Sequence, residues 1–262
     1  AAWRSPLTNW RRRPRQTGER RMTPFRKFVV VCAAIFAALY VAYLVIFPTV
    51  YLRYRLTLDV DVDGVTHTGS GVVEIAYQPP PDWLAGIGGG AHFLGTMRGY
   101  AITVDLGEHG LLFAVDSRPF LVDPKTGLII LPDAASLNML PFAAYGLSQS
   151  QSPSSGLAAA RELREKKGPV DIPPAKLPMI VRFTDINDRG TIEEVDPRDL
   201  AAAYGPGVRL VRAEFEFTTD PVSPMPKSWP KWLTEDKETE YRFSHQQLWS
   251  FATIWTIDFK GK

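Results

Sequence analysis

Residues 28–47 read FVVVCAAIFAALYVAYLVIF, and this stretch decides the architecture of the chain. It contains no charged residue, no proline and no glycine, and Pro48 follows it directly. An α-helix of about 20 residues is about 30 Å long, which matches the hydrocarbon core of a bilayer. A cleaved signal peptide would have a shorter apolar core and small residues at a cleavage site, and a buried core helix is seldom apolar on every face. The sequence therefore predicts a transmembrane helix.

Charge is divided unevenly about this stretch. The 262 residues have a formal net charge of only +2. Residues 1–27 hold nine basic residues and one acidic residue, a net charge of +8, whereas the rest of the chain holds 21 basic and 27 acidic residues, a net charge of −6. Because basic flanks stay on the cytoplasmic side, we expect a basic cytoplasmic tail over residues 1–27. Residues 49–262 are then expected on the outer side, which makes them a periplasmic domain if the membrane is a bacterial inner membrane.

Composition excludes several classes of protein. Hydrophobic residues make up 45% of the chain, too many for a disordered protein of low hydrophobicity and high net charge. The one cysteine, Cys32, cannot form an internal disulfide and lies within the apolar stretch. A disulfide-stapled scaffold is therefore excluded.

Strand patterns dominate the remainder of the chain. Apolar and polar residues alternate over residues 54–62, which predicts a half-buried strand, and Asp63-Gly64 predicts a tight turn into a second strand over residues 72–76. Gly69 and Gly71 suggest a bulge before that second strand. Further strands are predicted over residues 101–106, 111–115, 128–131, 179–183 and 208–218, with one or two more over 241–259.

Helices and loops are few in this part of the sequence. We expect a loop over residues 84–99, helical structure over 133–145, a charged helix over 157–167 and a helix that runs from Asp196-Pro197 to Gly205. The polar run SQSQSPSSG near residues 148–156 predicts an exposed loop. The fold class predicted is α+β, with an N-terminal single transmembrane helix followed by a mainly antiparallel β-rich domain with short helices.

No pattern in the sequence indicates a reaction. The four histidines lack metal-ligand spacing, and no nucleophile motif is present. The neighbouring Glu193 and Glu194 are expected on opposite sides of a strand as solvated surface. Asp185, Asn187 and Asp188 resemble half of a calcium loop, but an ordinary Asx turn explains them better. We therefore expect no catalytic residue, no metal site and no cofactor, and a protein that is not an enzyme. The four histidines are His67, His92, His109 and His245.

The basic tail has three interpretations. It can act as a topology signal that also binds anionic lipid headgroups at the cytoplasmic face, or it can dock on the acidic face of an integral membrane protein. Nucleic-acid binding is disfavoured, because the tail contains no folded reader. The residues expected to contact lipid or a partner are Trp3, Arg4, Trp10, Arg11, Arg12, Arg13 and Arg15.

Aromatic residues are concentrated near the C-terminus. Four of the seven tryptophans lie there, namely Trp229, Trp232, Trp249 and Trp255. They belong either to the core or to an aromatic surface that docks on a partner or on the outer membrane leaflet. We expect them to be partner contacts.

Two regions resemble an uncharacterised proteobacterial family of exported or single-pass membrane proteins without assigned activity. The first is RYRLTLDVDVDGVTHTGSGVVEI over residues 53–75, and the second contains PMIVRF over 178–183, VDPRDL over 195–200 and YGPGV over 204–208. The resemblance implies an exported domain and no catalytic residues. The chain departs from the family pattern in the proline-rich stretch 221–230 and in its basic tail.

These features favour a non-catalytic accessory subunit of a larger bacterial inner-membrane complex, with respiratory and photosynthetic complexes among the candidates. The tail, the helix and the periplasmic domain would all dock on the partner, an integral membrane protein complex. The alternative is a stand-alone membrane-tethered periplasmic binding module. A tethered hydrolase whose site the sequence does not reveal is a third hypothesis.

Overall fold

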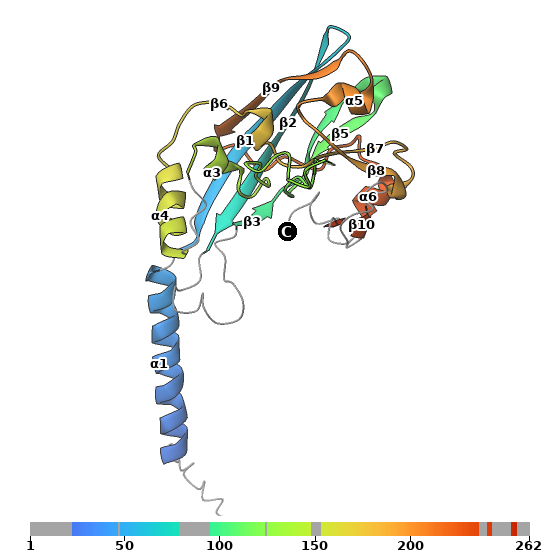
Figure 1. The fold of residues 1–262 in the computed structure, drawn as a ribbon. Coiled ribbons are helices and arrows are strands. Elements are labelled where there is room, and N and C mark those ends of the chain that lie inside the picture. Colours follow the sequence, from blue (N-terminus) through green and yellow to red (C-terminus); the bar gives the residue numbers. More distant parts are fainter. Residues whose placement is uncertain are drawn as a thin grey trace, which may run out of the picture. The chain divides into compact units, whose positions relative to one another are not determined.

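The computed structural model describes residues 23–46, 48–78, 95–123, 125–147, 153–235, 240–242 and 253–255. The chain forms two compact units, Ala1–Ile46 and Phe47–Lys262. An N-terminal apolar helix is followed by antiparallel sheets and short helices (Figure 1). The prediction of an α+β fold of this kind is therefore confirmed.

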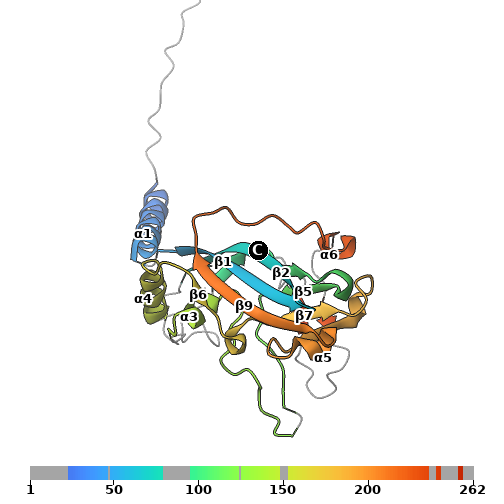
Figure 2. The same ribbon diagram turned by 90° about the horizontal axis from the view of Figure 1, so that it is seen from above.

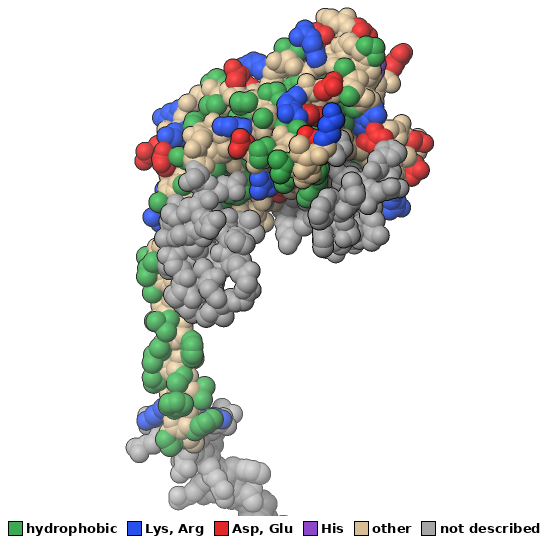
Figure 3. Space-filling view, viewed as in Figure 1, with side chains coloured by type: hydrophobic (Ala, Val, Ile, Leu, Met, Phe, Trp, Pro, Cys, Tyr) green, Lys and Arg blue, Asp and Glu red, His purple; other side chains and the backbone are tan. Residues whose placement is uncertain are grey.

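Helix α1 runs from Pro24 to Ile46. It belongs to the first unit, Ala1–Ile46. It begins before the predicted stretch because proline is well tolerated in the first turn of a helix. None of its residues is buried, and Figure 3 shows hydrophobic side chains along its length. Among the described residues it is the one helix long and apolar enough to cross a membrane, with a mean hydropathy of 2.7.

The larger of two principal sheets has the strand order β3-β2-β1-β9-β6, with every neighbouring pair antiparallel (Figures 1 and 2). In β1, Leu52, Tyr54 and Leu56 are buried, while Arg53 and Arg55 between them are half-buried. This alternation confirms the predicted half-buried strand. The strands are β1 (Val50–Val62), β2 (Val65–Tyr77), β3 (Gly95–Arg98), β6 (Val170–Asp171) and β9 (Val208–Phe217).

The predicted turn joins β1 to β2. Asp63 has a φ of 51° and Gly64 a φ of 88°, so both central residues have the positive φ that a two-residue hairpin turn of this type needs. The pairing of β1 with β2 then continues without a register shift from Val62 opposite Val65 to Val50 opposite Tyr77. The predicted second strand is thus present and is longer than expected.

The bulge predicted at Gly69 and Gly71 is wrong, because both glycines lie in the continuous strand β2. They allow β4 to pass closely over β2. A β-carbon on Gly69 would collide with the backbone carbonyl of Thr103, and one on Gly71 would lie 2.6 Å from Cδ1 of Ile102. The register shift occurs instead between β1 and β9, at Asp59 and Val60.

The second principal sheet has the order β4-β5-β7-β8 and is also antiparallel. One of its faces packs against the first sheet, where Ile102, Val104 and Leu112 join Leu56 and Leu58 in the main core. The opposite face forms a smaller core in which Phe113, Val181 and Phe183 pack with Trp229 and Leu233. The strands are β4 (Ile102–Asp105), β5 (Leu111–Ala114), β7 (Ile180–Phe183) and β8 (Ile192–Val195).

Short helices and turns complete the domain. The α-helices are α3 (Leu140–Ala144), α4 (Pro153–Leu163), α5 (Leu200–Tyr204) and α6 (Lys231–Glu235). The 3-10 helices are η1 (Gly107–His109), η2 (Pro174–Lys176) and η3 (Arg189–Thr191). Strands β10 (Glu240–Arg242) and β11 (Thr253–Trp255) pair as a two-stranded sheet, which agrees with the prediction of one or two final strands.

Several predicted elements are corrected by the structure. The strand expected over residues 128–131 is reduced to a single bridge between Val122 and Ile129. The predicted loop over 84–99 contains strand β3, and α4 begins at Pro153, inside the loop predicted over 148–156. Helix α5 begins after Asp199, whose side chain accepts a hydrogen bond from Ala202 N–H, because Asp196-Pro197 forms a preceding turn. Residues 79–94 and 148–152 lie outside the described part of the chain.

Candidate functional site

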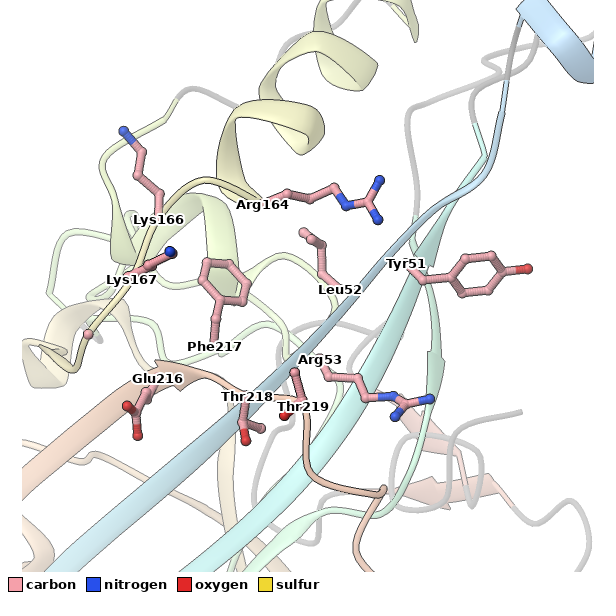
Figure 4. Close-up of a pocket in the computed structure, with 11 residues that line it drawn as sticks. Tyr51, Leu52, Arg53, Arg164, Lys166, Lys167, Glu216, Phe217, Thr218 and Thr219 are labelled. Carbon is pink, nitrogen blue, oxygen red and sulfur yellow. The ribbon is translucent and has the colours of Figure 1, made fainter.

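A cavity of about 550 Å³ opens beside the first residues of β1. We call it the β1 pocket (Figure 4). Its volume lies within the range that small-molecule sites commonly have. It is lined by Tyr51, Leu52 and Arg53 from β1, by Arg164 and residues 166–168 from the connection between α4 and β6, and by residues 216–219 at the end of β9.

Sheet pairing brings these three segments together. Strand β6 pairs with β9 through Val170 opposite Phe215, and the N–H group of Thr218 donates a 3.0 Å hydrogen bond to the carbonyl of Arg53 just past the end of β9. The connection from α4 bends at Gly168, whose φ of 83° is in the region that favours glycine. The pocket is therefore held by backbone bonds on two of its sides.

The rim of the pocket is basic. Four cationic side chains line it, against one carboxylate, that of Glu216. Arg53 forms an ion pair with Glu74, and Lys166 lies 2.9 Å from Glu162. The other two cations, Arg164 and Lys167, are exposed and have no carboxylate within ion-pair distance among the residues that the structure describes.

The floor of the pocket is apolar. Leu52 is 4% exposed, and Phe217 stacks on Tyr145 with ring centroids 5.8 Å apart and planes 1° from parallel. Lys166 Nζ lies 5.9 Å from the centre of the Tyr145 ring. Burial raises the pKa of Tyr145, the charge of Lys166 opposes that shift, and Glu216 adds to it. The site thus combines a cationic rim with an aromatic and aliphatic base.

Glu194 is a second candidate for a functional residue. The prediction that it lies on a solvated surface is wrong. Its Oε1 accepts a hydrogen bond of 2.8 Å from the N–H of Phe120, and its Oε2 is buried without a hydrogen-bond partner. Burial raises the pKa of Glu194 to about 7; the N–H groups of Phe120 and Leu121 oppose the shift, and Asp196 adds to it. A single carboxylate that faces backbone donors is suited to hold a chain segment in place.

Glu193 contributes to a separate ion pair. Its carboxylate lies 2.8 Å from Arg182, and the Arg182 guanidinium lies 5.2 Å from the centre of the Tyr204 ring. Arg182 also donates to the carbonyl of Ala203. These contacts join β7 and β8 to α5, so their role is to hold the fold together.

Both histidines that the structure describes face backbone carbonyls. His67 Nδ1 lies 2.8 Å from the carbonyl of Asp105, and His109 Nδ1 lies 2.8 Å from the carbonyl of Tyr204. A ring nitrogen that faces a carbonyl must carry the proton. His92 and His245 lie outside the described residues. No group of three His, Cys, Asp or Glu side chains that could hold a metal ion occurs within the described ranges.

The predicted Asx turns are present between β7 and β8. The carboxylate of Asp185 accepts a hydrogen bond from Asn187 N–H at 2.9 Å, and that of Asp188 accepts one from Gly190 N–H at 2.8 Å. Both carboxylates are thus engaged by their own loop. The ordinary-turn interpretation of this segment is confirmed.

Two of the predicted aromatic contacts lie inside the domain. Trp229 is 5% exposed, and its Nε1 donates a 2.8 Å hydrogen bond to Thr103 Oγ1. Trp232 is half-buried, and its Nε1 donates to the carbonyl of Ile186 at 2.8 Å. The core interpretation therefore accounts for Trp229, which offers almost no surface to a partner, and for much of Trp232.

The remaining predicted contacts are only partly described. Trp255 lies in β11, where its backbone pairs with Glu240. Trp249 and the tail residues lie outside the described part of the chain, and these tail residues are Trp3, Arg4, Trp10, Arg11, Arg12, Arg13 and Arg15.

Comparison with protein-family models, with curated proteins and with solved structures finds no match for this chain. The resemblance to a proteobacterial family consequently stays a prediction. The features of the chain that bear on function are its two units and the β1 pocket.

The sequence contains one local signal in a segment that lines this pocket. Lys166-Lys167-Gly168 ends the predicted charged helix, and basic residues followed by glycine at a helix end predict a C-terminal cap. Pairing between β6 and β9 brings this segment beside Phe217, and no local pattern reveals a pairing between strands so far apart in the chain. The pocket therefore could not be predicted from spacing alone.

Proposed function

We propose that this chain is a single-pass protein of a bacterial inner membrane and a non-catalytic accessory subunit of a larger membrane complex. The observation that carries the proposal is the apolar surface of α1. Phe25, Phe36 and Val45 are each more than 70% exposed, and no residue of the helix is buried. Apolar surface costs about 25 cal/mol per Å² in water, so a helix of this kind needs lipid or protein around it.

The charge distribution supports an orientation with the N-terminus in the cytoplasm. Nine basic residues precede the apolar stretch, and Arg53 and Arg55 are the only basic residues that follow it closely. Because basic flanks are usually retained in the cytoplasm, this charge pattern supports a periplasmic position for the β-rich domain.

The polar groups of the domain support a role in binding rather than in catalysis. Several polar side chains form hydrogen bonds with backbone groups, namely those of Glu194, Arg182, His67 and His109. Groups held in this way stabilise the fold. A domain built on such contacts is suited to cover a partner or to hold a ligand.

A second candidate is the stand-alone membrane-tethered periplasmic binding module. The β1 pocket favours it, because its volume of about 550 Å³ is enough for a small ligand. The two candidates differ in whether the chain has a permanent protein partner.

Purification of the affinity-tagged full chain in a mild detergent separates the two candidates. We expect it to elute together with other integral membrane proteins, which mass spectrometry would identify. A matched control replaces residues 28–47 with a leucine–alanine span, which preserves the anchor and removes the side chains of α1. Loss of partners in this control would assign them to the helix. A monodisperse monomer from the unaltered chain would rule out the subunit role and leave the binding module.

A further inference from the structure

The β1 pocket follows the membrane-spanning helix closely in the chain. Tyr51, at its edge, comes five positions after Ile46, the last residue of α1. Five residues reach at most about 18 Å even when fully extended. If α1 crosses a membrane, the chain therefore keeps this edge of the pocket near the headgroups of the leaflet on the domain's side.

The rim carries two cations that no carboxylate of the described residues pairs with. Arg164 and Lys167 project from the connection after α4 (Figure 4), and both lack a carboxylate partner among the described residues. The whole domain side of the chain has a net charge of −6, so a local excess of cations runs against its average. Such a cluster attracts an anionic surface or group.

Stabilisation of α4 explains only part of this arrangement. Cations after a helix C-terminus interact favourably with the helix dipole. That effect needs no cavity, whereas here the cations line the same cavity as Leu52 and Phe217. A cationic rim over an apolar floor is complementary to a molecule with an anionic group beside an apolar part.

We propose that the β1 pocket binds the phosphate headgroup of an anionic phospholipid of the phosphatidylglycerol type in the adjacent leaflet. Arg164 and Lys167 bind the phosphate, and the hydroxyl groups of Thr218 and Thr219 face the glycerol part. Leu52 and Phe217 contact the apolar part of the lipid next to the phosphate, where the acyl chains begin. This inference rests on the proposed membrane anchoring of α1. It gives the domain a defined contact with the membrane surface.

The test uses the full chain in lipid nanodiscs with a fluorescent label on the domain. Ala158, an exposed residue of α4 outside the pocket, is replaced by cysteine in a Cys32→Ser background. A constant small fraction of headgroup-spin-labelled phosphatidylcholine quenches the label when the domain settles on the bilayer. Discs of phosphatidylcholine alone are compared with discs that contain about one quarter phosphatidylglycerol. We expect stronger quenching with phosphatidylglycerol, because the label lies on the domain and does not sense the tail.

Two double variants separate the pocket from general charge. Arg164→Gln with Lys167→Gln should lower the phosphatidylglycerol-dependent association about fivefold for each cation removed. Lys227→Gln with Lys231→Gln removes the same charge from exposed sites that do not line the pocket and should leave the effect unchanged. Thermal melting of each variant checks that the fold is intact. We expect unchanged melting temperatures, because the replaced side chains are exposed and have no ion-pair partner among the described residues.

Each other outcome overturns the proposal in a distinguishable way. A chain that does not elute with the discs contradicts membrane anchoring and the lipid site together. A chain that enters the discs but is quenched equally with and without phosphatidylglycerol contradicts the lipid site alone, as would equal losses in both double variants. If inorganic phosphate alters the label in phosphatidylcholine discs while phosphatidylglycerol does not, the pocket is a site for soluble phosphate instead.

Discussion

The carboxylate of Glu194 and the backbone of Phe120 are joined by a 2.8 Å hydrogen bond between Oε1 and the N–H group. The bond ties β8 to the segment that leaves β5, and burial raises the pKa of Glu194 to about 7. In the folded protein the carboxyl group therefore binds a proton more tightly than at its ordinary pKa of 4.5. Its contribution to stability is complete below about pH 4.5 and is lost as pH rises through about 7.

The variant Glu194→Gln should remove this pH dependence, because its amide stays neutral. At pH 8 we expect its free energy of unfolding to exceed that of the unaltered chain by about 3 kcal/mol, which is the energy of a pKa difference of about 2.5 units. At pH 4.5 the two should be nearly equal. Urea unfolding of the full chain in detergent, followed by tryptophan fluorescence, measures the difference. Glu193→Gln is the matched control: it removes the same charge but also the partner of Arg182, so it should lower stability at pH 8.

The two glycines of β2 should respond differently to alanine. At Gly69 the new methyl group meets the backbone carbonyl of Thr103, which cannot move without shifting β4. We expect Gly69→Ala to lower the free energy of unfolding by at least about 1–3 kcal/mol. At Gly71 the methyl group meets Cδ1 of Ile102, the end of a flexible side chain. Gly71→Ala should therefore cost less than about 1 kcal/mol, and thermal melting of both variants compares them. Equal costs would contradict the close crossing of β4 over β2.

Strand β9 provides a test of its register. Val211 is 50% exposed, whereas Phe215 is fully buried and stacks on Tyr54 at 4.6 Å. Val211→Thr should change stability by no more than about 0.5 kcal/mol, as surface substitutions do. Phe215→Ala should cost about 3–5 kcal/mol, because it empties a packed site. Chemical denaturation would show this difference, and a large effect at Val211 would contradict the register.

This register also shows where the sequence pattern fails. Alternation predicts that Val211, Ala213, Phe215 and Phe217 share one face. The last three follow the pattern as buried or half-buried residues, but Val211 is the extra residue at the shift opposite Asp59 and Val60, so it faces out. One inserted residue reverses the side to which a strand's side chains point. Nothing local in the sequence marks the insertion.

Local signals predict the elements that depend on neighbouring residues. The Asp63-Gly64 turn, the alternation in β1 and the apolar stretch of α1 all depend on chemistry within a few residues, and each appears as expected. Features that depend on distant strands have no such local signal. The crossing of β4 at Gly69, the burial of Glu194 and the β1 pocket all arise from contacts between segments at least 30 positions apart.

Trp229 should behave as a core residue. Its Nε1 bonds to Thr103 Oγ1, and its ring packs edge-on against Phe113 with centroids 6.0 Å apart. We expect Trp229→Ala to cost about 3–5 kcal/mol. A double-mutant cycle of Trp229→Phe with Thr103→Val isolates the hydrogen bond and should give a coupling of about 0.5–1.5 kcal/mol. Full stability of Trp229→Ala with loss of co-purifying proteins would restore the partner-contact hypothesis.

The orientation of the chain can be tested with single cysteines in the Cys32→Ser background. Ser228 is exposed in the domain, and Thr17 belongs to the basic tail. If the tail is cytoplasmic, a membrane-impermeant maleimide should label Ser228→Cys in intact spheroplasts and label Thr17→Cys only after the membrane is opened.

Replacing four of the nine tail cations by glutamine, at Arg11, Arg12, Arg13 and Arg15, weakens the basic flank that determines orientation. A fraction of the chains should then invert, so that Thr17→Cys becomes labelled from outside. Labelling of Thr17→Cys in spheroplasts of the unaltered tail would reverse the proposed topology, because the domain would then face the cytoplasm.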